Sequence, residues 1–358
     1  MKRALRLAER GRGRTRPNPT VGAVIVRAGR VVGEGWHRAA GEPHAEVMAL
    51  RRAGARARGA TLYVTLEPCA HLGRTPPCVD AIIAAGIRRC VVAMRDPHRI
   101  VNGRGLRRLR SAGVAVELGI GGTEARAALA GYSLAHREGR PRVTWKVAAT
   151  LDGRVADARG RARWITGAAA RRWTHALRAR SDAIVIGAGT ARADDPRLTV
   201  RLGRGAAVPQ PLRVVCDTRL ALPLGLKLYR GLARGTVAVC ARGASPARRR
   251  ALAARGAQVW ELPRGRGGIA VRALARRLVR AGCHDVLLEC GPELGAAWLR
   301  AGLVDEIALT IAPRLLGGHA RSWPAEFGVA SLAAARRGRL IELARLGQDA
   351  LIRMEVRR

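Results

Sequence analysis

Pro43-His44-Ala45-Glu46 and Glu67-Pro68-Cys69-Ala70-His71-Leu72-Gly73-Arg74-Thr75-Pro76-Pro77-Cys78 are the two stretches on which the fold of the first part of this chain depends. They contain one histidine and two cysteines that can serve as zinc ligands, namely His44, Cys69 and Cys78. Three protein ligands leave the fourth tetrahedral position open for a water whose pKa the metal lowers. Glu46 is then the candidate catalytic residue, because a nearby carboxylate can carry protons from that water to a leaving amine.

A purely structural zinc site is the alternative interpretation of these residues. Such a site is normally closed by a fourth protein ligand, and none accompanies this set. The cysteine spacing is also unusual, because zinc nucleobase deaminases commonly have two residues between their cysteines, whereas eight separate Cys69 from Cys78. The pattern predicts a catalytic site with an insertion between its two thiolate ligands.

Local sequence signals in the first part alternate between helix and strand. Apolar residues Val47, Leu50 and Ala53 recur at three-residue steps, which indicates a helix whose first turn carries the histidine ligand. A strand ends just before the first cysteine. Helices are predicted over residues 2–9, 44–53, 78–85, 106–112 and 124–137, and strands over 21–27, 30–35, 61–65, 89–94 and 114–118.

A chain of 358 residues exceeds one typical core, since domains commonly contain about 100 to 200 residues. We place the boundary at Arg140-Pro141, which predicts domains at 1–140 and 141–358. The second part again alternates, and predicts a parallel or mixed sheet. Its strands are expected at 143–149, 183–186, 212–216, 236–240, 286–289 and 306–311, its helices at 168–180 and 271–281, and surface loops or helix edges at 244–255 and 264–268.

Composition narrows the classes of protein further. No uncharged apolar run of about 18 residues and no apolar signal core is present, so we expect a cytoplasmic protein without membrane spans. Seven scattered cysteines do not suggest a disulfide framework. The net charge of +40 comes almost entirely from arginine spread along the whole chain, and aromatic content is only 3%. We therefore expect no specific nucleic-acid partner, only weak and salt-sensitive binding.

Ordered motifs in both halves resemble one family, the bifunctional riboflavin biosynthesis proteins that join a pyrimidine deaminase to a reductase. The resemblance covers nearly the whole chain. In the first half it rests on Pro17-Asn18-Pro19-Thr20-Val21-Gly22, His44-Ala45-Glu46, Thr65-Leu66-Glu67-Pro68-Cys69 and Thr75-Pro76-Pro77-Cys78, and in the second on Lys146, Leu151-Asp152-Gly153, Trp164-Ile165-Thr166, Leu177-Arg178-Ala179, Ala193-Asp194-Asp195-Pro196, Leu198-Thr199-Val200-Arg201, Glu289-Cys290-Gly291-Pro292 and Val304-Asp305-Glu306.

The resemblance implies an α/β fold with two different domains. The N-terminal domain would be a cytidine-deaminase-like three-layer α/β/α domain with one Zn²⁺, which deaminates 2,5-diamino-6-(5-phosphoribosylamino)pyrimidin-4(3H)-one. The C-terminal domain would be dihydrofolate-reductase-like and would reduce the ribosyl group to ribityl with NADPH. That fold explains why the chain contains no Gly-x-Gly-x-x-Gly helix entry. The partner is then a small phosphorylated pyrimidine, and a homo-oligomer is expected.

Site residues carried over from the family fall into two groups beside the zinc centre. Substrate contacts are expected from Asn18, His71, Ala162, Arg178, Leu198, Arg201 and Glu289. Cofactor contacts are expected from Ala148, Trp164, Thr190, Asp194, Thr218, Gly291, Pro292, Glu293, Leu294 and Gly295. Arginine suits a substrate phosphate because its planar guanidinium group offers two parallel N–H donors to the phosphate oxygens.

The chain departs from the family pattern at a few positions. Ala162 stands where a serine near the substrate is usual, and Thr150 replaces the serine before Leu151-Asp152-Gly153. His98-Arg99 stands where asparagine and proline are usual. Three other interpretations stay open at this point: a transfer RNA adenosine deaminase, a deaminase with a decayed reductase domain, and a nucleic-acid-binding protein on a retired enzyme scaffold.

Overall fold

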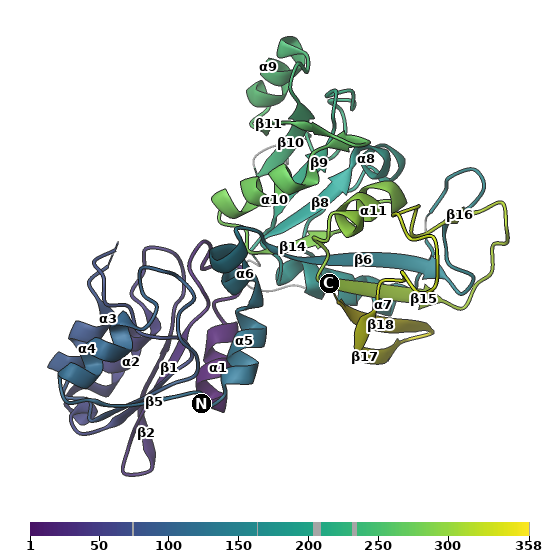
Figure 1. The fold of residues 1–358 in the computed structure, drawn as a ribbon. Helices are drawn as coiled ribbons and strands as arrows, with labels where there is room; N and C mark the ends of the chain where they lie inside the picture. The colour runs from purple at the N-terminus through teal and green to yellow at the C-terminus, as the bar shows by residue number, and fades with distance from the viewer. Residues whose placement is uncertain (74, 163, 203–208, 231–234, 358) are drawn as a thin grey trace. The chain divides into compact units, whose positions relative to one another are not determined.

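The computed structural model describes residues 1–73, 75–162, 164–202, 209–230 and 235–357 (Figure 1). The chain divides into two compact units, Met1–Arg140 and Pro141–Arg358. Each unit has its own sheet and its own hydrophobic core. Among the described residues, no helix is long and apolar enough to cross a membrane.

The first unit is built on a five-stranded sheet of order β2-β1-β3-β4-β5. Strand β1 is antiparallel to β2 and β3, whereas β3, β4 and β5 run parallel. The parallel order brings the C-terminal ends of β3 and β4 to the same edge of the sheet. The strands are β1 (Gly22–Arg27), β2 (Arg30–Trp36), β3 (Thr61–Val64), β4 (Arg89–Val92) and β5 (Ala115–Leu118).

Helices cover both faces of this sheet, because side chains of the buried strands alternate between two apolar layers. Ala23 and Ile25 of β1 pack in the core that holds α2, α3 and α4, whereas Val24 packs with α1. Figure 1 shows α2, α3 and α4 gathered together and α1 beside α5. The helices are α1 (Lys2–Glu9), α2 (Ala45–Ala53), α3 (Cys78–Ala84), α4 (Arg104–Ser111), α5 (Gly122–Ala128) and α6 (Ala130–Glu138), with a short 3₁₀ turn at Gly54–Ala57.

Close contact between β2 and α2 depends on glycine. A Cβ on Gly35 would lie 2.5 Å from the carbonyl oxygen of Ala45, which no side chain can tolerate. The first turn of α2 therefore lies directly on the sheet, and this turn carries Glu46. The single helix expected over 124–137 is instead two helices, since Leu129 between them has φ −108° and ψ 21°, outside the helical range.

The second unit contains a nine-stranded sheet of order β11-β10-β9-β8-β14-β6-β15-β18-β17. Neighbours from β11 to β15 are parallel, and β18 and β17 close that edge as an antiparallel hairpin. The strands are β6 (Arg142–Thr150), β8 (Ala183–Gly187), β9 (Leu212–Cys216), β10 (Thr236–Ala241), β11 (Gln258–Leu262), β14 (Asp285–Leu288), β15 (Glu306–Ala312), β17 (Gly338–Leu346) and β18 (Asp349–Val356).

Helices pack on both faces of the larger sheet as well. One core layer includes Leu274 of α10 and Trp298 of α11, and the other includes Ala191 of α8 and Leu252 of α9. The helices are α7 (Ala168–Ala179), α8 (Ala188–Asp194), α9 (Pro246–Ala254), α10 (Val271–Arg280) and α11 (Pro292–Arg300); two small ribbons pair β7 (Arg154–Ala156) with β16 (Arg321–Ser322) and β12 (Arg264–Gly265) with β13 (Gly268–Ile269).

Two segments expected as loops or helix edges have regular structure. Residues 244–255 hold α9, which Ser245 caps by accepting a hydrogen bond from the Arg248 amide, with Pro246 in the first turn. Residues 264–268 hold most of the β12–β13 ribbon. Ser245, Pro246 and the alanine- and arginine-rich run after them are helix signals that our interpretation missed, whereas residues 264–268 contain only arginine and glycine and show no apolar alternation.

Candidate zinc centre and reductase cleft

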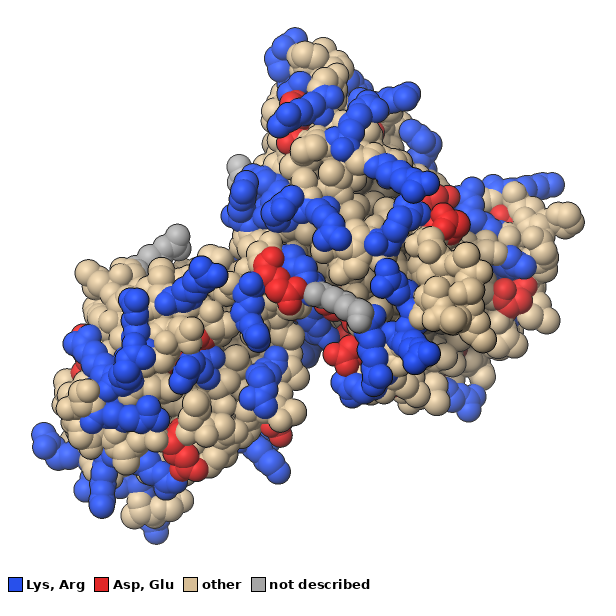
Figure 2. Space-filling model, viewed as in Figure 1, with Lys and Arg blue, Asp and Glu red and all other residues tan. Residues whose placement is uncertain are grey.

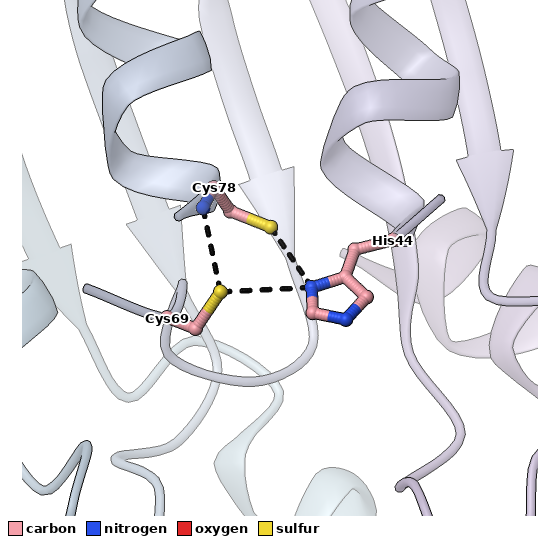
Figure 3. Close-up of side chains that lie close together, drawn as sticks. All are labelled: His44, Cys69 and Cys78. Atoms are coloured by element: carbon pink, nitrogen blue, oxygen red, sulfur yellow. Dashed lines mark hydrogen bonds between the residues drawn. The ribbon is translucent and has the colours of Figure 1, made fainter. Parts of the chain in front are cut away.

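His44, Cys69 and Cys78 come from three separate elements that meet at one end of the smaller sheet (Figure 3). His44 is the N-cap of α2, Cys69 follows the end of β3, and Cys78 is the first residue of α3. His44 Nδ1 lies 3.1 Å from Cys78 Sγ and 3.6 Å from Cys69 Sγ. The three possible ligand atoms all lie within 4.8 Å of one another. The parallel strand order explains this convergence, since it places the β3 end beside the two helix starts.

The donor set fits zinc, because an imidazole and two thiolates are the ligands of this metal in open catalytic sites. The backbone amide of Cys78, at the start of α3, donates to Cys69 Sγ at 3.3 Å. Hydrogen bonding from the Cys78 and His44 side chains holds the pKa of Cys69 below its ordinary value, whereas the same bond between the two cysteines, together with burial, raises the pKa of Cys78. A deprotonated sulfur is the form that binds a metal. His44, Cys69 and Cys78 are the residues that would hold the ion.

Glu46 lies in the first turn of α2 and is 3% exposed. Burial is the main cause that raises the pKa of its carboxyl to about 7, and the charge of Cys69 adds to the effect. A carboxyl group with a pKa near neutrality can both accept and release a proton at physiological pH. Its position two residues beyond His44 places it next to the ligands.

Two further residues expected to contact substrate lie around this centre. The Asn18 side chain is hydrogen-bonded to His37, whose ring packs against His44. His71 has a buried Nδ1 without a hydrogen-bond partner among the described residues, which is consistent with a partner supplied by a ligand. Arg74, in the same loop as His71, lies outside the described residues.

His37 is a residue that our interpretation of the sequence missed. It is 2% exposed, and both of its ring nitrogens have hydrogen-bond partners: the Asn18 side chain at Nε2 and the Pro43 carbonyl at Nδ1. Burial lowers its pKa. The available signal was a histidine directly after β2 and seven positions before His44.

The second unit contains a cleft of about 1450 Å³ at the C-terminal ends of its parallel strands. This is where ligands bind in open α/β sheets. Of the residues expected to bind cofactor or substrate in this unit, nearly all line the cleft: Ala148, Ala162, Trp164, Arg178, Thr190, Asp194, Leu198, Arg201, Thr218, Glu289, Gly291, Pro292, Glu293 and Leu294.

Gly295 is not among the residues that line the cleft. A Cβ at this position would lie 2.0 Å from the ring of Trp145 in β6, so the glycine lets α11 pack onto the sheet. The turn before it remains suited to a phosphate. Gly291 caps the N-terminus of α11, and its amide donates to Thr190 Oγ1 at 3.1 Å, which joins two of the expected cofactor residues.

Arg178 is held by Glu289 inside the cleft. Its Nε and Nη2 donate to the two carboxylate oxygens at 2.5 and 2.6 Å, and Nη1 donates to the Thr199 carbonyl at 3.1 Å. Burial alone would raise the pKa of Glu289, but the Arg178 charge holds it below its ordinary value. Burial lowers the pKa of Lys146, which lies near this pair. Arg201, at the more exposed edge, donates through Nη1 to Thr199 Oγ1 at 2.9 Å.

Known protein families match this chain in both of its units. The family model described as RibD C-terminal domain matches residues 141–352, and that described as cytidine and deoxycytidylate deaminase zinc-binding region matches residues 1–94. The riboflavin biosynthesis protein RibD of Escherichia coli (strain K12) is 43% identical over 99% of this chain and 98% of the relative. The chain belongs to the RibD family. RibD of Aquifex aeolicus (strain VF5) is 40% identical, over 98% of this chain and 96% of its own.

Solved structures of RibD proteins have the same architecture. Acinetobacter baumannii RibD matches with a TM-score of 0.91 at 40% identity, covering 99% of this chain and 97% of that one. A Thermotoga maritima diaminohydroxyphosphoribosylaminopyrimidine deaminase/5-amino-6-(5-phosphoribosylamino)uracil reductase matches with a TM-score of 0.86 at 32% identity, with 99% and 97% coverage.

The expected fold class and the family resemblance are therefore confirmed. This chain is a bifunctional riboflavin biosynthesis enzyme with a zinc-binding deaminase domain and a reductase domain, and its cofactors are zinc and NADPH. Family membership over the full length sets aside a transfer RNA deaminase and a nucleic-acid-binding scaffold as interpretations.

Proposed function

We propose that the chain carries out two consecutive reactions on one phosphorylated pyrimidine. Residues 1–140 would deaminate 2,5-diamino-6-(5-phosphoribosylamino)pyrimidin-4(3H)-one, and residues 141–358 would reduce the ribosyl group of the product to ribityl. The observation that carries the proposal is the three-ligand centre at His44, Cys69 and Cys78 beside a buried Glu46, in the same chain as the large cleft.

In the deaminase unit, bound zinc would supply a water activated by a lowered pKa. Glu46 takes a proton from the water while the water oxygen bonds to the ring carbon. Glu46 then delivers that proton to the departing amine. The C–N bond breaks, a C–O bond takes its place, and ammonia leaves. Asn18 and His71 hold the pyrimidine in position for this transfer. The pKa of Glu46, which burial raises to about 7, suits a group that both accepts and donates.

In the reductase unit, bound NADPH would supply a hydride to the ribosyl carbon. Gly291 and Pro292 at the start of α11 offer the helix N-terminus to a cofactor phosphate, with Thr190 fixing the turn. Trp164 and Asp194 belong to the same cleft. Arg201 binds the substrate phosphate at the outer edge, and Glu289 faces the sugar with its charge balanced by Arg178.

The deaminase assignment is tested by Glu46→Gln. We expect ammonia release to fall by about 10² to 10⁴-fold, because general acid–base catalysis is worth that much. Zinc content and NADPH oxidation with deaminated substrate should stay at wild-type level. Glu124→Gln, at an exposed glutamate of α5, is the matched control. If the intact protein performs neither reaction with zinc and NADPH supplied, the proposed function is wrong; loss of only the second would identify a decayed reductase.

We also propose that the enzyme acts in the cytoplasm as a homo-oligomer on a free small-molecule substrate. The support is the family and the lack of a membrane-spanning helix in the described part of the chain. Light scattering of the purified protein measures the oligomeric state directly, and a single-chain mass would contradict this part of the proposal.

A further inference from the structure

His37 is a buried histidine of the deaminase unit, beside the three possible zinc ligands. It directly follows β2, and its ring meets the ring of His44 edge to face, with 5.2 Å between centroids and 88° between planes. It is not part of the possible metal-binding group, which within the described residues comprises only His44, Cys69 and Cys78. His37 therefore lies against the zinc centre without belonging to it.

Both ring nitrogens of His37 have partners. Nδ1 lies 3.3 Å from the carbonyl oxygen of Pro43, the residue before the ligand His44. Nε2 lies 3.0 Å from the side-chain Nδ2 of Asn18. The ring thus connects the chain segment that carries a zinc ligand with a residue expected to contact the substrate.

The chemistry of these partners determines where the protons are. A carbonyl oxygen cannot donate, so Nδ1 of His37 must carry the proton in its hydrogen bond to Pro43. In the neutral ring Nε2 then has only a lone pair, and only the N–H₂ end of the Asn18 amide can bond to it. The other end of that amide, Oδ1, is not used in the bond to His37 and is an acceptor that a ligand can engage.

We propose that His37 is a positioning residue that fixes the Asn18 amide so that Oδ1 can accept a hydrogen bond from an N–H group of the aminopyrimidine. The inference rests on the proposed deaminase function. The amide would otherwise be free to rotate by 180° and present its N–H₂ end, which repels an amino group. His37 thereby makes the site selective for a substrate that offers a donor at this position.

Two substitutions separate the two hydrogen bonds of the ring. In His37→Asn the amide nitrogen takes the place of Nδ1 and keeps the bond to Pro43, whereas the acceptor for Asn18 is lost. In His37→Gln the amide oxygen takes the place of Nε2 and keeps that acceptor. We expect kcat/KM for ammonia release to fall about 10 to 100-fold in His37→Asn, as expected when a polar side chain in the site loses its hydrogen-bond partner, and less than about fivefold in His37→Gln.

A double-mutant cycle with Asn18→Ala distinguishes positioning from a general structural role. If His37 acts through the Asn18 amide, His37→Asn causes no further loss once that amide is absent, so the two effects are not additive. Zinc affinity, measured by chelator competition, and reductase activity should match wild type in each variant. His319→Asn, at an exposed histidine of the second unit, controls for the substitution itself.

Substrate binding gives a readout that needs no turnover. In a Glu46→Gln background, calorimetry with the pyrimidine substrate should show a dissociation constant raised about 10-fold or more by His37→Asn. Additive losses, unchanged kinetics in His37→Asn, or loss of zinc in that variant would each overturn the positioning role. Absence of ammonia release by the wild-type protein would instead overturn the proposed function on which this role depends.

Discussion

Asp96 shows at the scale of one residue how burial shapes the deaminase unit. It is 5% exposed, and its Oδ1 accepts hydrogen bonds from the His98 amide at 2.8 Å and the Tyr132 hydroxyl at 3.1 Å. Burial outweighs these bonds and raises the pKa of Asp96 from its ordinary value of 3.8 to about 6. The folded state therefore binds this proton more tightly than the unfolded chain does.

The consequence is a pH dependence of stability. Proton binding by Asp96 adds to the free energy of unfolding. This contribution is fully present below about pH 4 and is lost as the pH rises through about 6, which lowers the free energy of unfolding by about 3 kcal/mol. An asparagine side chain at this position would accept the same hydrogen bonds and would carry no charge at any pH. We predict that Asp96→Asn gains stability relative to wild type between about pH 4.5 and pH 7, measured by calorimetric unfolding. A difference that does not change with pH would contradict this.

The ion pair between Arg178 and Glu289 predicts a different effect in the cleft. Their side chains are only 12% and 13% exposed, so Arg178→Ala leaves a carboxylate buried without its partner. We expect a loss of about 3 to 5 kcal/mol in the free energy of unfolding, measured with urea. The exposed pair of Arg339 and Glu355 is the control, since Arg339→Ala should cost less than about 1 kcal/mol. Equal losses in the two variants would contradict the prediction.

At the scale of elements, Glu67 joins the turn before Cys69 to the N-terminus of α4. Its buried carboxylate accepts hydrogen bonds from the backbone amides of Asp96, Gly103, Gly105 and Leu106, at 2.8 to 3.3 Å. A negative charge at a helix start is favourable, and its hydrogen bonds are strong. The turn that carries a zinc ligand is thereby fixed to a helix about 35 residues further along.

Glu67→Gln keeps the shape of this side chain but replaces one acceptor oxygen with a donor. At least one backbone amide then faces another N–H group, which costs about 1 to 3 kcal/mol. We predict a loss of this size in urea unfolding of the deaminase unit, together with weaker zinc retention against a chelator. Glu124→Gln removes an exposed charge from the first turn of α5 and should cost less than about 1 kcal/mol, with zinc retention unchanged. Wild-type stability of the Glu67 variant would show that the carboxylate charge is not needed.

Sequence patterns predicted elements well where one buried face repeats. The strands at 183–186 and 212–216 and the helix at 271–281 are confirmed within one or two residues, because apolar periodicity is local information. The hairpin of β17 and β18 was not predicted, since half-exposed residues on β17 weaken its alternation and only the pairing with β15 shows its place.

The candidate sites show the same division between local and long-range information. Ligand types and spacing predicted the zinc group, whose three atoms the structure brings together. Gly295 looked like part of the phosphate turn, and only its contact with Trp145 shows a packing role. His37 could not be found from spacing alone, because its importance depends on Asn18 and His44, which are brought to it by folding.

At the scale of the whole molecule, the dominant property is the net charge of +40. Figure 2 shows Lys and Arg scattered over the visible face of each unit, with few acidic side chains between them. A dense patch would neutralise many phosphates at once, whereas scattered charges engage few of them in any one orientation. The charge therefore predicts general attraction to polyanions without a defined binding site.

We predict that the protein binds duplex DNA at low ionic strength and releases it as salt approaches physiological concentration. Each phosphate contact releases counterions, so the logarithm of the binding constant should fall linearly with the logarithm of the salt concentration. Fluorescence titration of a labelled duplex of mixed sequence measures this, with a scrambled duplex expected to bind equally. At about 0.15 M salt, screening limits the range over which exposed charges attract one another to about 8 Å. Nanomolar binding that survives this salt concentration, or a preference between the duplexes, would therefore show that the arginines form a specific nucleic-acid site.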